Sequence, residues 1–506
     1  MPDLTSELSV CEAVYPTVPG SNDETCHETL PAYTPSGSLI PMIPRQNDRY
    51  ERATLLTPEY IKIPRGLHTA LMLEEPPYIA QGWTVSVNPE GSPFYIHRDK
   101  HLITDDPIQQ AGICDKIMES EKRLSLLVET EGLKLPDDYE CYITCDAESD
   151  KCKYYYVDYS TQTVFWLEEI DPERHDINMA PVCSVAQMKH LLQEQYWLHN
   201  EYFPYRAVPS PLRKELVAVF RQGRADQLTS TLSTFPYDAQ QCKQFLQVID
   251  VETDCDEYMT WTIGTLDLAL SRHRYHTFFG EDHARISRDQ KRFEVIKYER
   301  TFVIKLISAL LFNLPKTRLA ELNDLAADDV AYAIHWREFA VELLRGWRDS
   351  SYLVRVTACY EIPMEVIAAT SISRPNNPIS TALGSASVVL ALGGLVSSGL
   401  LLQWYAGADT RKFDAPFVAT HLGQIICPRH GYEPMAQAYS LPRALVFWSI
   451  IFLALHMLSA VVDLTGLIVQ APAFLLAGIF VIAICQLHQS LRCAFAVASV
   501  EKEKVY

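Results

Sequence analysis

Histidine and cysteine side chains are the first groups to test for chemistry in this sequence, because they bind metals and transfer protons. Three histidines, His273, His276 and His283, lie close together, with acidic residues between the last two. Imidazole and carboxylate are both zinc ligands. Arginines crowd the same stretch, however, and because cations repel a divalent metal we interpret it as the basic end of a helix. The arginines are Arg272, Arg274, Arg285 and Arg288.

Cysteine is the other candidate metal ligand. Cys141, Cys145 and Cys152 lie close together, but no second pair completes the four ligands of a zinc site. The chain has 13 cysteines, an odd number without paired spacing. The sequence therefore predicts free thiols in a reducing cytosol rather than a disulfide framework.

Motifs of known enzymes are not found in the sequence. The chain has no phosphate-cradling glycine loop, no nucleophile elbow and no His-Glu-x-x-His pair. Its net charge of −19 over 506 residues disfavours nucleic-acid binding. We therefore predict no catalytic residue, no metal and no cofactor, and we interpret the protein as a non-enzyme. An enzyme built on an unfamiliar helical fold stays the alternative.

Two segments rich in aromatic residues are the strongest candidates for a binding function. They cover residues 76–108 and 133–172. In both, aromatic and β-branched residues alternate around polar turns, which predicts three-stranded antiparallel meanders. A sheet of this size buries little, so its aromatic side chains must supply both the core and any binding groove.

The segment 133–172 resembles a WW domain, the small sheet that binds proline-rich peptides. Leu135-Pro136 opens it, Tyr139 stands in place of the first tryptophan, and Tyr155–Tyr159 followed by Trp166 reproduces the spacing of the second and third strands. The resemblance implies that Tyr155 and Trp166 enclose a ligand proline on an exposed face. It also implies that a neighbouring pocket is lined by Val157, Tyr159 and Gln162, although the family usually has histidine at the position of Tyr159.

The segment 76–108 resembles the same family less closely. It keeps the opening tryptophan as Trp83, but Asp105 stands where the second tryptophan is expected. The resemblance then implies a degenerate copy that lacks half of the proline-binding pair. Its remaining candidate contacts are Phe94, Tyr95 and Ile96.

Residues 1–50 form an acidic, proline-rich tail with almost no aliphatic periodicity, so we expect them to be disordered. Short proline-containing segments such as Pro16–Pro19, Leu30–Tyr33 and Pro41–Pro44 can present an extended helix to an aromatic groove. A hypothesis follows in which Leu30–Tyr33 occupies the module of its own chain or of a neighbouring copy.

Three long apolar runs near the C-terminus predict membrane-spanning helices at 378–405, 443–463 and 466–489. The first belongs to a stretch without charge, Pro375–Ala408. Each run can cross about 30 Å of hydrocarbon at about 1.5 Å per residue. Trp404 and Tyr405 lie where an aromatic belt is expected. Residues 406–442 and 490–506 are then a loop and a tail, and buried helices of a soluble domain are the alternative.

Small residues recur in the first of these runs, at Gly393, Gly394, Ser397, Ser398 and Gly399. Such residues let a second helix approach closely, so we expect either homo-oligomerisation through this span or packing on the other two. His456 lies in the middle of the second run. We interpret it as a neutral imidazole bonded to a neighbouring helix rather than as a functional group.

Two rules disagree on the side of the membrane that holds the N-terminal region. With three spans, 406–442 and 490–506 share one side and carry most of the Lys and Arg near the spans, which places the N-terminal region outside. Residues 1–30 contain no signal peptide, however, and long domains follow the charge rule poorly. We predict an integral, multi-pass membrane protein with its N-terminal region in the cytosol.

The region 176–370 is predicted to be a helical domain, because apolar residues recur at steps of three and four. Leu212, Leu216 and Val219 are an example. Within this region Thr301–Asn313 is strongly apolar, but it is too short to cross a membrane. We therefore expect it in the core.

Together these patterns predict a multidomain fold class: two small three-stranded antiparallel β modules similar to WW domains, an all-α domain and three C-terminal transmembrane helices. The function that follows is a membrane-anchored adaptor or scaffold that recruits proline-rich protein segments to a lipid bilayer. A channel- or transporter-like protein with a regulatory soluble region is the alternative. A scaffold that acts only through its helical domain is a third hypothesis.

Overall fold

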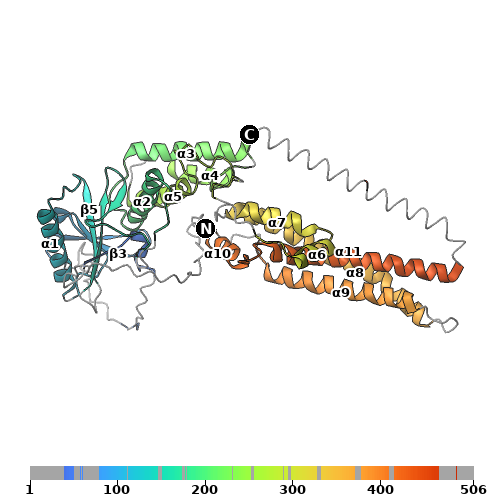
Figure 1. Ribbon diagram of the computed structural model, residues 1–506. Helices are drawn as coiled ribbons and strands as arrows, with labels where there is room; N and C mark the ends of the chain where they lie inside the picture. The colour runs from blue at the N-terminus through green and yellow to red at the C-terminus, as the bar shows by residue number, and fades with distance from the viewer. Residues whose placement is uncertain are drawn as a thin grey trace, which may run out of the picture. The chain divides into compact units, whose positions relative to one another are not determined.

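The computed structural model describes most of the chain, in two compact units (Figure 1). The described residues are 39–50, 57–58, 60, 79–110, 112–145, 151–173, 177, 179–230, 232–251, 256–288, 290–293, 298–326, 332–370, 378–408, 415–465 and 486. The first unit comprises Met1–Lys297, Asn323–Arg337 and Thr410–Ile425, and the second comprises Tyr298–Leu322, Glu338–Asp409 and Ile426–Tyr506. Each unit is described by itself.

The first unit is built on one seven-stranded sheet. Its strands are β1 (Leu39–Pro41), β2 (Trp83–Val87), β3 (Pro93–His97), β4 (Leu102–Thr104), β5 (Tyr139–Cys145), β6 (Cys152–Asp158) and β7 (Thr163–Phe165). The order is β1-β6-β5-β4-β3-β2, and β7 also pairs with β6. Strands β2–β3–β4 and β5–β6–β7 pair antiparallel, whereas β4 pairs with β5, and β1 with β6, in parallel.

The parallel pairing of β4 with β5 shows that the expected fold class of two separate three-stranded modules is wrong. Leu102 pairs with Cys141 and Ile103 with Tyr142, so one mixed sheet results. Parallel neighbours need a crossover connection, which α1 (Ile113–Glu131) supplies. No pattern noted in the sequence predicted this helix. The pairing is favourable because it satisfies backbone groups that the edge of a small separate sheet leaves exposed.

Helices cover both faces of the sheet (Figure 1). Alternate strand residues point to opposite faces, and each set enters a different cluster. On one face, α1 buries Ile117 and Leu124 in a cluster with Leu102 and Tyr156. On the other face lies α2 (Val185–Tyr202), which buries aromatic side chains against those of the strands: Phe94, Tyr142, Tyr155, Tyr196, Trp197 and Tyr202.

The helices expected as one separate domain over 176–370 are divided between the two units. Following α2, the helices α3 (Ser210–Thr229), α4 (Ala239–Ile249) and α5 (Glu257–His276) share the core of the sheet. The second unit contains the helix α6 and most of the residues of α7 and α8. The physical reason is that a short meander cannot bury its aromatic face alone, and α2 covers it.

The end of the N-terminal segment, expected to be disordered, is part of the fold. Leu39–Pro41 forms β1, and Pro44–Gln46 forms the short 3-10 helix η2. The backbone N–H of Met42 donates to the carbonyl of Tyr154 at 2.9 Å, and the Met42 side chain is buried. Residues 1–38, with the Leu30–Tyr33 segment, lie outside the described residues.

Two of the cysteines expected to be free thiols form a disulfide. Cys145 and Cys152 are direct cross-strand neighbours at the end of the β5–β6 pair, and a disulfide joins them. Cys141 is free and buried. Spacing along the chain did not indicate this bond, because the strand register brings the two residues together.

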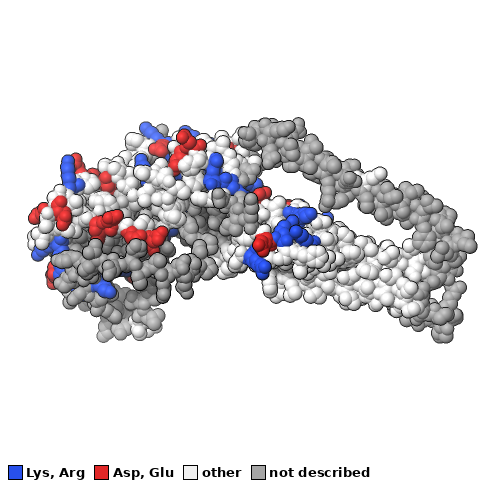
Figure 2. All heavy atoms as spheres, in the orientation of Figure 1, with Lys and Arg blue, Asp and Glu red and all other residues white. Residues whose placement is uncertain are grey.

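The second unit is a bundle of long helices. It contains α6 (Phe302–Leu310), most of α7 (Leu314–Leu325) and of α8 (Ala333–Thr370), α9 (Pro378–Trp404) and α11 (Glu433–Thr465), whereas α10 (Ala415–Ile425) belongs to the first unit. Two stretches, Pro378–Trp404 and Glu433–Ser459, are each 27 residues long and apolar enough to cross a membrane. In Figure 2 the surface of α9 and α11 is uncharged over most of its length.

The expected count of three C-terminal transmembrane helices is corrected to two candidates within the described residues. They correspond to the first two predicted runs, 378–405 and 443–463. The third run, 466–489, lies outside the described residues except for Gln486.

Small residues form the contact of α9 with α11. The buried positions of α9 recur at steps of three and four: Gly384, Ser387, Ala391, Gly394 and Ser398. A Cβ atom built on Gly394 would lie 3.2 Å from the Val446 side chain, so the two backbones approach closely. Of the small residues singled out in the sequence, Gly394 and Ser398 belong to this face, which therefore packs within the chain.

Polar groups between α9 and α11 bond with one another. The hydroxyl of Ser387 donates to the carbonyl of Ser449 at 2.8 Å. His456 is buried, and its Nδ1 lies 2.8 Å from the carbonyl oxygen of Ser380. The imidazole is thus bonded to a neighbouring helix, as the sequence analysis expected.

The short apolar stretch Thr301–Asn313 does not form a core, contrary to expectation. In α6 the side chains of Phe302 and Val303 are 78% and 60% exposed, and that of Leu310 is 51% exposed. Ile304 and Ser308 are buried and form the opposite face of the helix. The helix is therefore apolar on its exposed face too.

Candidate functional site

The aromatic residues expected to bind a peptide do not form an exposed groove. Tyr155 and Val157 are both 0% exposed, because α2 covers their face of the sheet. Tyr159 is half-buried, and Gln162 adopts a left-handed backbone conformation in the turn between β6 and β7, with φ of 57°. The predicted proline-binding face is therefore an internal contact of this chain.

The candidate contacts of the weaker module are also internal. Phe94 and Ile96 lie in the cluster under α2, and Tyr95 lies in the cluster under α1. Each has less than a tenth of its surface exposed. The three residues pack the sheet on both faces and form no common surface.

Trp166 contacts a proline-containing segment, and that segment belongs to its own chain. The indole Nε1–H donates to the carbonyl oxygen of Met42 at 2.8 Å. Met42 lies within Pro41–Pro44, one of the segments singled out in the sequence. The structure brings Trp166 together with β1 and η2, whereas Tyr155 bonds to α2.

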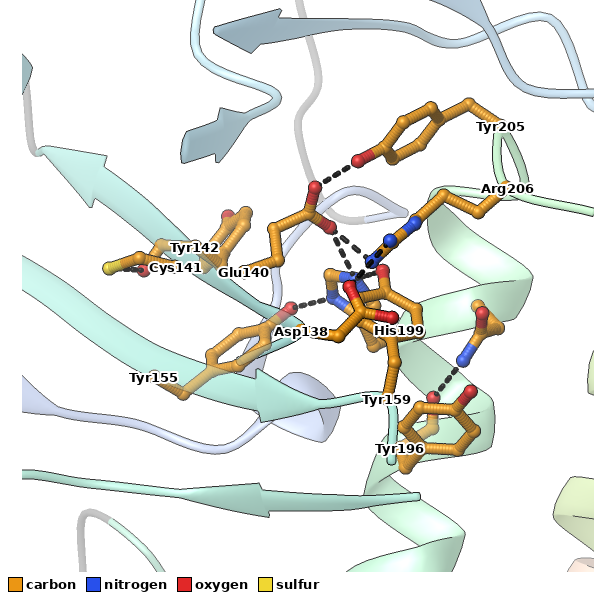
Figure 3. Close-up of polar contacts among 11 residues, drawn as sticks. Asp138, Glu140, Cys141, Tyr142, Tyr155, Tyr159, Tyr196, His199, Tyr205 and Arg206 are labelled. Atoms are coloured by element: carbon orange, nitrogen blue, oxygen red, sulfur yellow. Dashed lines mark hydrogen bonds and ion pairs between the residues drawn. The ribbon is translucent and has the colours of Figure 1, made fainter. Parts of the chain in front are cut away.

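A buried polar network joins β5 to α2 (Figure 3). The carboxylate of Glu140 accepts hydrogen bonds from the Tyr159 hydroxyl at 2.9 Å and from the hydroxyl of Tyr205. Its Oε2 also lies 3.1 Å from Nε2 of His199. The Nδ1 atom of His199 is 3.1 Å from the Tyr155 hydroxyl. A neutral imidazole with its proton on Nε2 donates to Glu140 and accepts from Tyr155.

The network compensates for burying a carboxylate. Glu140 is 2% exposed and His199 is 0% exposed, and an ion at such a position is costly unless hydrogen bonds satisfy it. Burial and the charge of Glu140 raise the pKa of Tyr159 and of Tyr205 far above the ordinary value, so both hydroxyls stay protonated donors. The Glu140 carboxylate is thus committed to holding its neighbours together, which leaves it poorly placed as a general base.

Arg206 extends this network to the surface. Its guanidinium lies 3.7 Å from the centre of the Tyr159 ring and donates to Asp138 at 2.6 Å. The guanidinium therefore stacks on the ring and closes one side of the network (Figure 3).

A cavity of about 410 Å³ adjoins the network. It is lined by Glu140, Tyr205 and Arg206 of the network, together with Ile96, His97, Arg98 and His101. Within the described residues, the buried Nδ1 atom of His97 makes no hydrogen bond. A few hundred cubic ångströms suffice for a small ligand or for one or two side chains of a peptide.

Arg98 and His101, two of the residues that line this cavity, are exposed. Arg98 begins η4 (Arg98–Lys100), and His101 follows it with a left-handed φ of 50°. The neighbouring Lys100 pairs with Glu121 at 2.6 Å. In the part of the chain that the structure describes, Arg98 forms no such ion pair. Arg98 is thus available to an acidic group that enters the cavity.

The histidine group considered as a metal site lies at the end of α5. Burial lowers the pKa of His273 to about 3 and that of His276 to about 4, and nearby arginines act in the same direction. His283 lies 3.3 Å from Glu281 in the loop that follows. The described residues contain no cluster of three metal-ligating side chains.

Sequence reasoning missed Glu140 and His199, because no motif joins residues so far apart in the chain. The signal was a single acidic residue in the strand Tyr139–Cys145, where an unpaired charge is not expected. Scans of known protein families, curated proteins and solved structures find no match to this chain. The resemblance to WW domains therefore stays a prediction.

Proposed function

We propose that this protein is a membrane-anchored adaptor. In this proposal α9 and α11 hold the chain in a bilayer, and the sheet of the first unit recognises a partner. The length of the two helices, their largely uncharged surface and the mutual bonding of their polar groups support anchoring. The last observation also favours an anchor over the channel- or transporter-like alternative, whose polar groups would line a pathway.

The site that we propose for recognition is the cavity beside the Glu140 network. It replaces the groove expected at Tyr155, because α2 covers that face. The observation that carries the proposal is the exposed Arg98 at a cavity of about 410 Å³. An arginine without an intramolecular partner binds a carboxylate through paired hydrogen bonds. The ligand class is therefore an acidic side chain of a partner protein.

A titration with an acidic peptide tests this proposal. The full chain in detergent micelles is titrated with a fluorescent oligoglutamate peptide, and anisotropy reports binding. Replacing Arg98 with alanine should weaken binding by about tenfold or more, since hydrogen bonds to charged groups contribute about 1.5–3 kcal/mol. An oligolysine peptide and a peptide copied from residues 26–46 test whether acidic groups are preferred.

Arg221→Ala is the matched control. Arg221 is an exposed arginine of α3, pairs with Asp250 at 2.7 Å and does not line the cavity. Saturable binding that Arg98→Ala weakens and Arg221→Ala leaves unchanged supports the site. Equal weakening by both substitutions, or no saturable binding of the acidic peptide, contradicts it.

A further inference from the structure

We propose that α8 crosses the bilayer together with α9 and α11. The inference rests on the membrane anchoring proposed above, and it concerns a helix that composition does not single out. Its residues within the second unit begin at Glu338. It is a different segment from the run at 466–489, and contacts rather than hydropathy place it in the membrane.

Successive turns of α8 contact α9 and α11. Trp347 donates from Nε1 to the carbonyl of Tyr439 at 3.0 Å. One turn further on, the hydroxyls of Ser351 and Ser398 are 2.7 Å apart and buried. Trp347 contacts Tyr405 just after α9, Ser351 contacts Ser398, and Val354 packs with Ala391, so α8 and α9 are antiparallel.

The next contact continues this direction. Val354 is 3% exposed and packs in one cluster with Ala391 of α9 and Val446 of α11. Ala391 lies in the middle of the α9 candidate span, and Val446 lies within that of α11. At Val354, α8 is therefore already at the depth of both candidate spans.

From Trp347 to its end, α8 is long enough to cross the hydrocarbon core of a bilayer. It continues without interruption to Thr370. From Trp347 to Thr370 the axis advances about 35 Å at about 1.5 Å per residue, which exceeds the roughly 30 Å of a hydrocarbon core. Trp347 also contacts the rings of Tyr405 and Tyr439, with centroids 5.6 and 5.7 Å away, as in an aromatic belt at a membrane interface.

A count of crossings gives independent support. Nδ1 of His430 lies 2.8 Å from the carbonyl oxygen of Glu299, and Arg300 pairs with Glu433. Segments in contact lie on the same side of a membrane, so the chain between them crosses an even number of times. α9 accounts for one crossing, and a second is required.

A contact within the first unit leads to the same count over a shorter part of the chain. The rings of Trp336 and His421 are 5.3 Å apart, and Trp336 precedes the deep part of α8 whereas His421 follows α9. Among the described residues between these two, α8 and α9 are the long helices. The second crossing is therefore α8.

Charged residues explain why the sequence analysis did not identify this span. Arg355, Glu361 and Glu365 fall within the part of α8 that continues beyond Val354. Insertion scales assign a charged residue at a helix centre a cost of about 2.5–3.5 kcal/mol, and such residues mark functional positions in membranes.

The second crossing also removes the disagreement on orientation. With α8 and α9 both spanning, the loop between α9 and α11 lies on the side of the N-terminal region. Among the basic residues that flank α8, α9 and the start of α11, Arg374 then lies on the opposite side, and the others share the side of the N-terminal region: Arg345, Arg348, Arg411, Lys412, Arg429 and Arg443. Applied to these residues, the charge rule places the N-terminal region in the cytosol.

Protease accessibility of the full chain in sealed vesicles tests the inference. A site for a sequence-specific protease is inserted, in separate variants, within 51–56, 371–377 or 409–414, three ranges outside the described residues. We expect the sites at 51–56 and 409–414 to be cut from the same side of the vesicle. The site at 371–377 should be cut only from the opposite side. Detergent should expose all three sites, which is the control for each insertion.

The other outcomes separate the two proposals. In one outcome the sites at 51–56 and 371–377 are cut from the same side, and the site at 409–414 is cut from the other side. Then α9 crosses the membrane and α8 does not, so the inference falls and the anchoring by α9 stands. If all three sites share one side, neither helix crosses, and the inference and the proposed anchoring by α9 both fall. If 371–377 and 409–414 share the side opposite to 51–56, α8 and α9 do not cross as a pair, and the inference falls.

Discussion

At the scale of single residues, the first unit holds a buried glutamate, Glu140, and a half-buried one, Glu201, that are bonded in contrasting ways. Glu140 is surrounded by donors, with Tyr159, Tyr205 and His199 all bonded to its carboxylate. Glu201 has a buried oxygen, Oε2, with no hydrogen bond among the described residues. The first carboxylate accepts the hydrogen bonds that hold β5 to α2. Burial raises the pKa of the second.

This contrast predicts how Glu201→Gln changes the dependence of stability on pH. Burial and the charge of Glu90 raise the pKa of Glu201 from 4.5 to about 7. The folded wild type therefore loses stability as the pH rises from the unfolded pKa to the folded one, and the loss is complete above pH 7.

The glutamine variant has no such loss. Its advantage should be absent at low pH and should reach up to about 3 kcal/mol above pH 7, since one pKa unit corresponds to about 1.4 kcal/mol. Thermal unfolding of the full chain across this range measures it. Parallel pH profiles for the two proteins would contradict the prediction.

At the scale of elements, β1 depends on one side chain that follows β7, the other strand that pairs with β6 beside β5. Trp166 donates to the carbonyl of Met42, and Met42 N–H donates to Tyr154, so both sides of this segment are bonded. These contacts explain why a segment without aliphatic periodicity is ordered. The strand that pairs with this segment, β6, lies more than a hundred residues further along the chain.

Trp166→Phe should loosen β1. Phenylalanine keeps the ring but removes the donor, at a cost of about 1 kcal/mol, and the amide of Met42 should exchange with solvent faster. Hydrogen exchange measured by mass spectrometry tests this. Trp261→Phe is the matched control, because Nε1 of Trp261 has no hydrogen bond in the described chain. Equal effects of the two substitutions would refute the role of the indole donor.

The contact between α9 and α11 leads to a second prediction. Gly394→Leu should separate the helices, because the added side chain meets Val446 and the carbonyl of Pro442. Overpacking of this kind costs about 1–3 kcal/mol, which appears as a lower unfolding temperature in micelles. Gly399→Leu is the control, since nothing lies within 4 Å of a Cβ built there. Equal unfolding temperatures of the two variants would show that close approach of α9 and α11 is not required.

At the scale of the whole molecule, the two units divide the work that the proposed function requires. The first unit has charged side chains over its surface, and the second exposes apolar ones along α6 and α9 (Figure 2). Exposed apolar surface of this extent marks a membrane or a binding partner.

The full chain should therefore stay with membranes after alkaline carbonate extraction, a treatment that releases peripheral proteins. The expected result is retention in the membrane pellet. Release of the chain into the supernatant would contradict anchoring by α9 and α11. Partition is measured by immunoblotting, with a peripheral protein of the same membrane as the control.

The sequence by itself determined the features that depend on local patterns. Apolar runs identified α9 and α11, and alternating aromatic residues located the strands from β2 to β7, because hydropathy and side-chain alternation are properties of short segments. The interpretation of His456 as bonded to a neighbouring helix also held.

Only the tertiary structure decided how these elements combine. The parallel pairing of β4 with β5, the cover of α2 over Tyr155, the Cys145–Cys152 bond and the Glu140–His199 network all join residues through space. No local pattern encodes such contacts, since each depends on register and on which face another element covers. The contacts of α8 with α9 and α11 belong to the same class, and the proposed crossing by α8 rests on them because its charged residues lower its hydropathy.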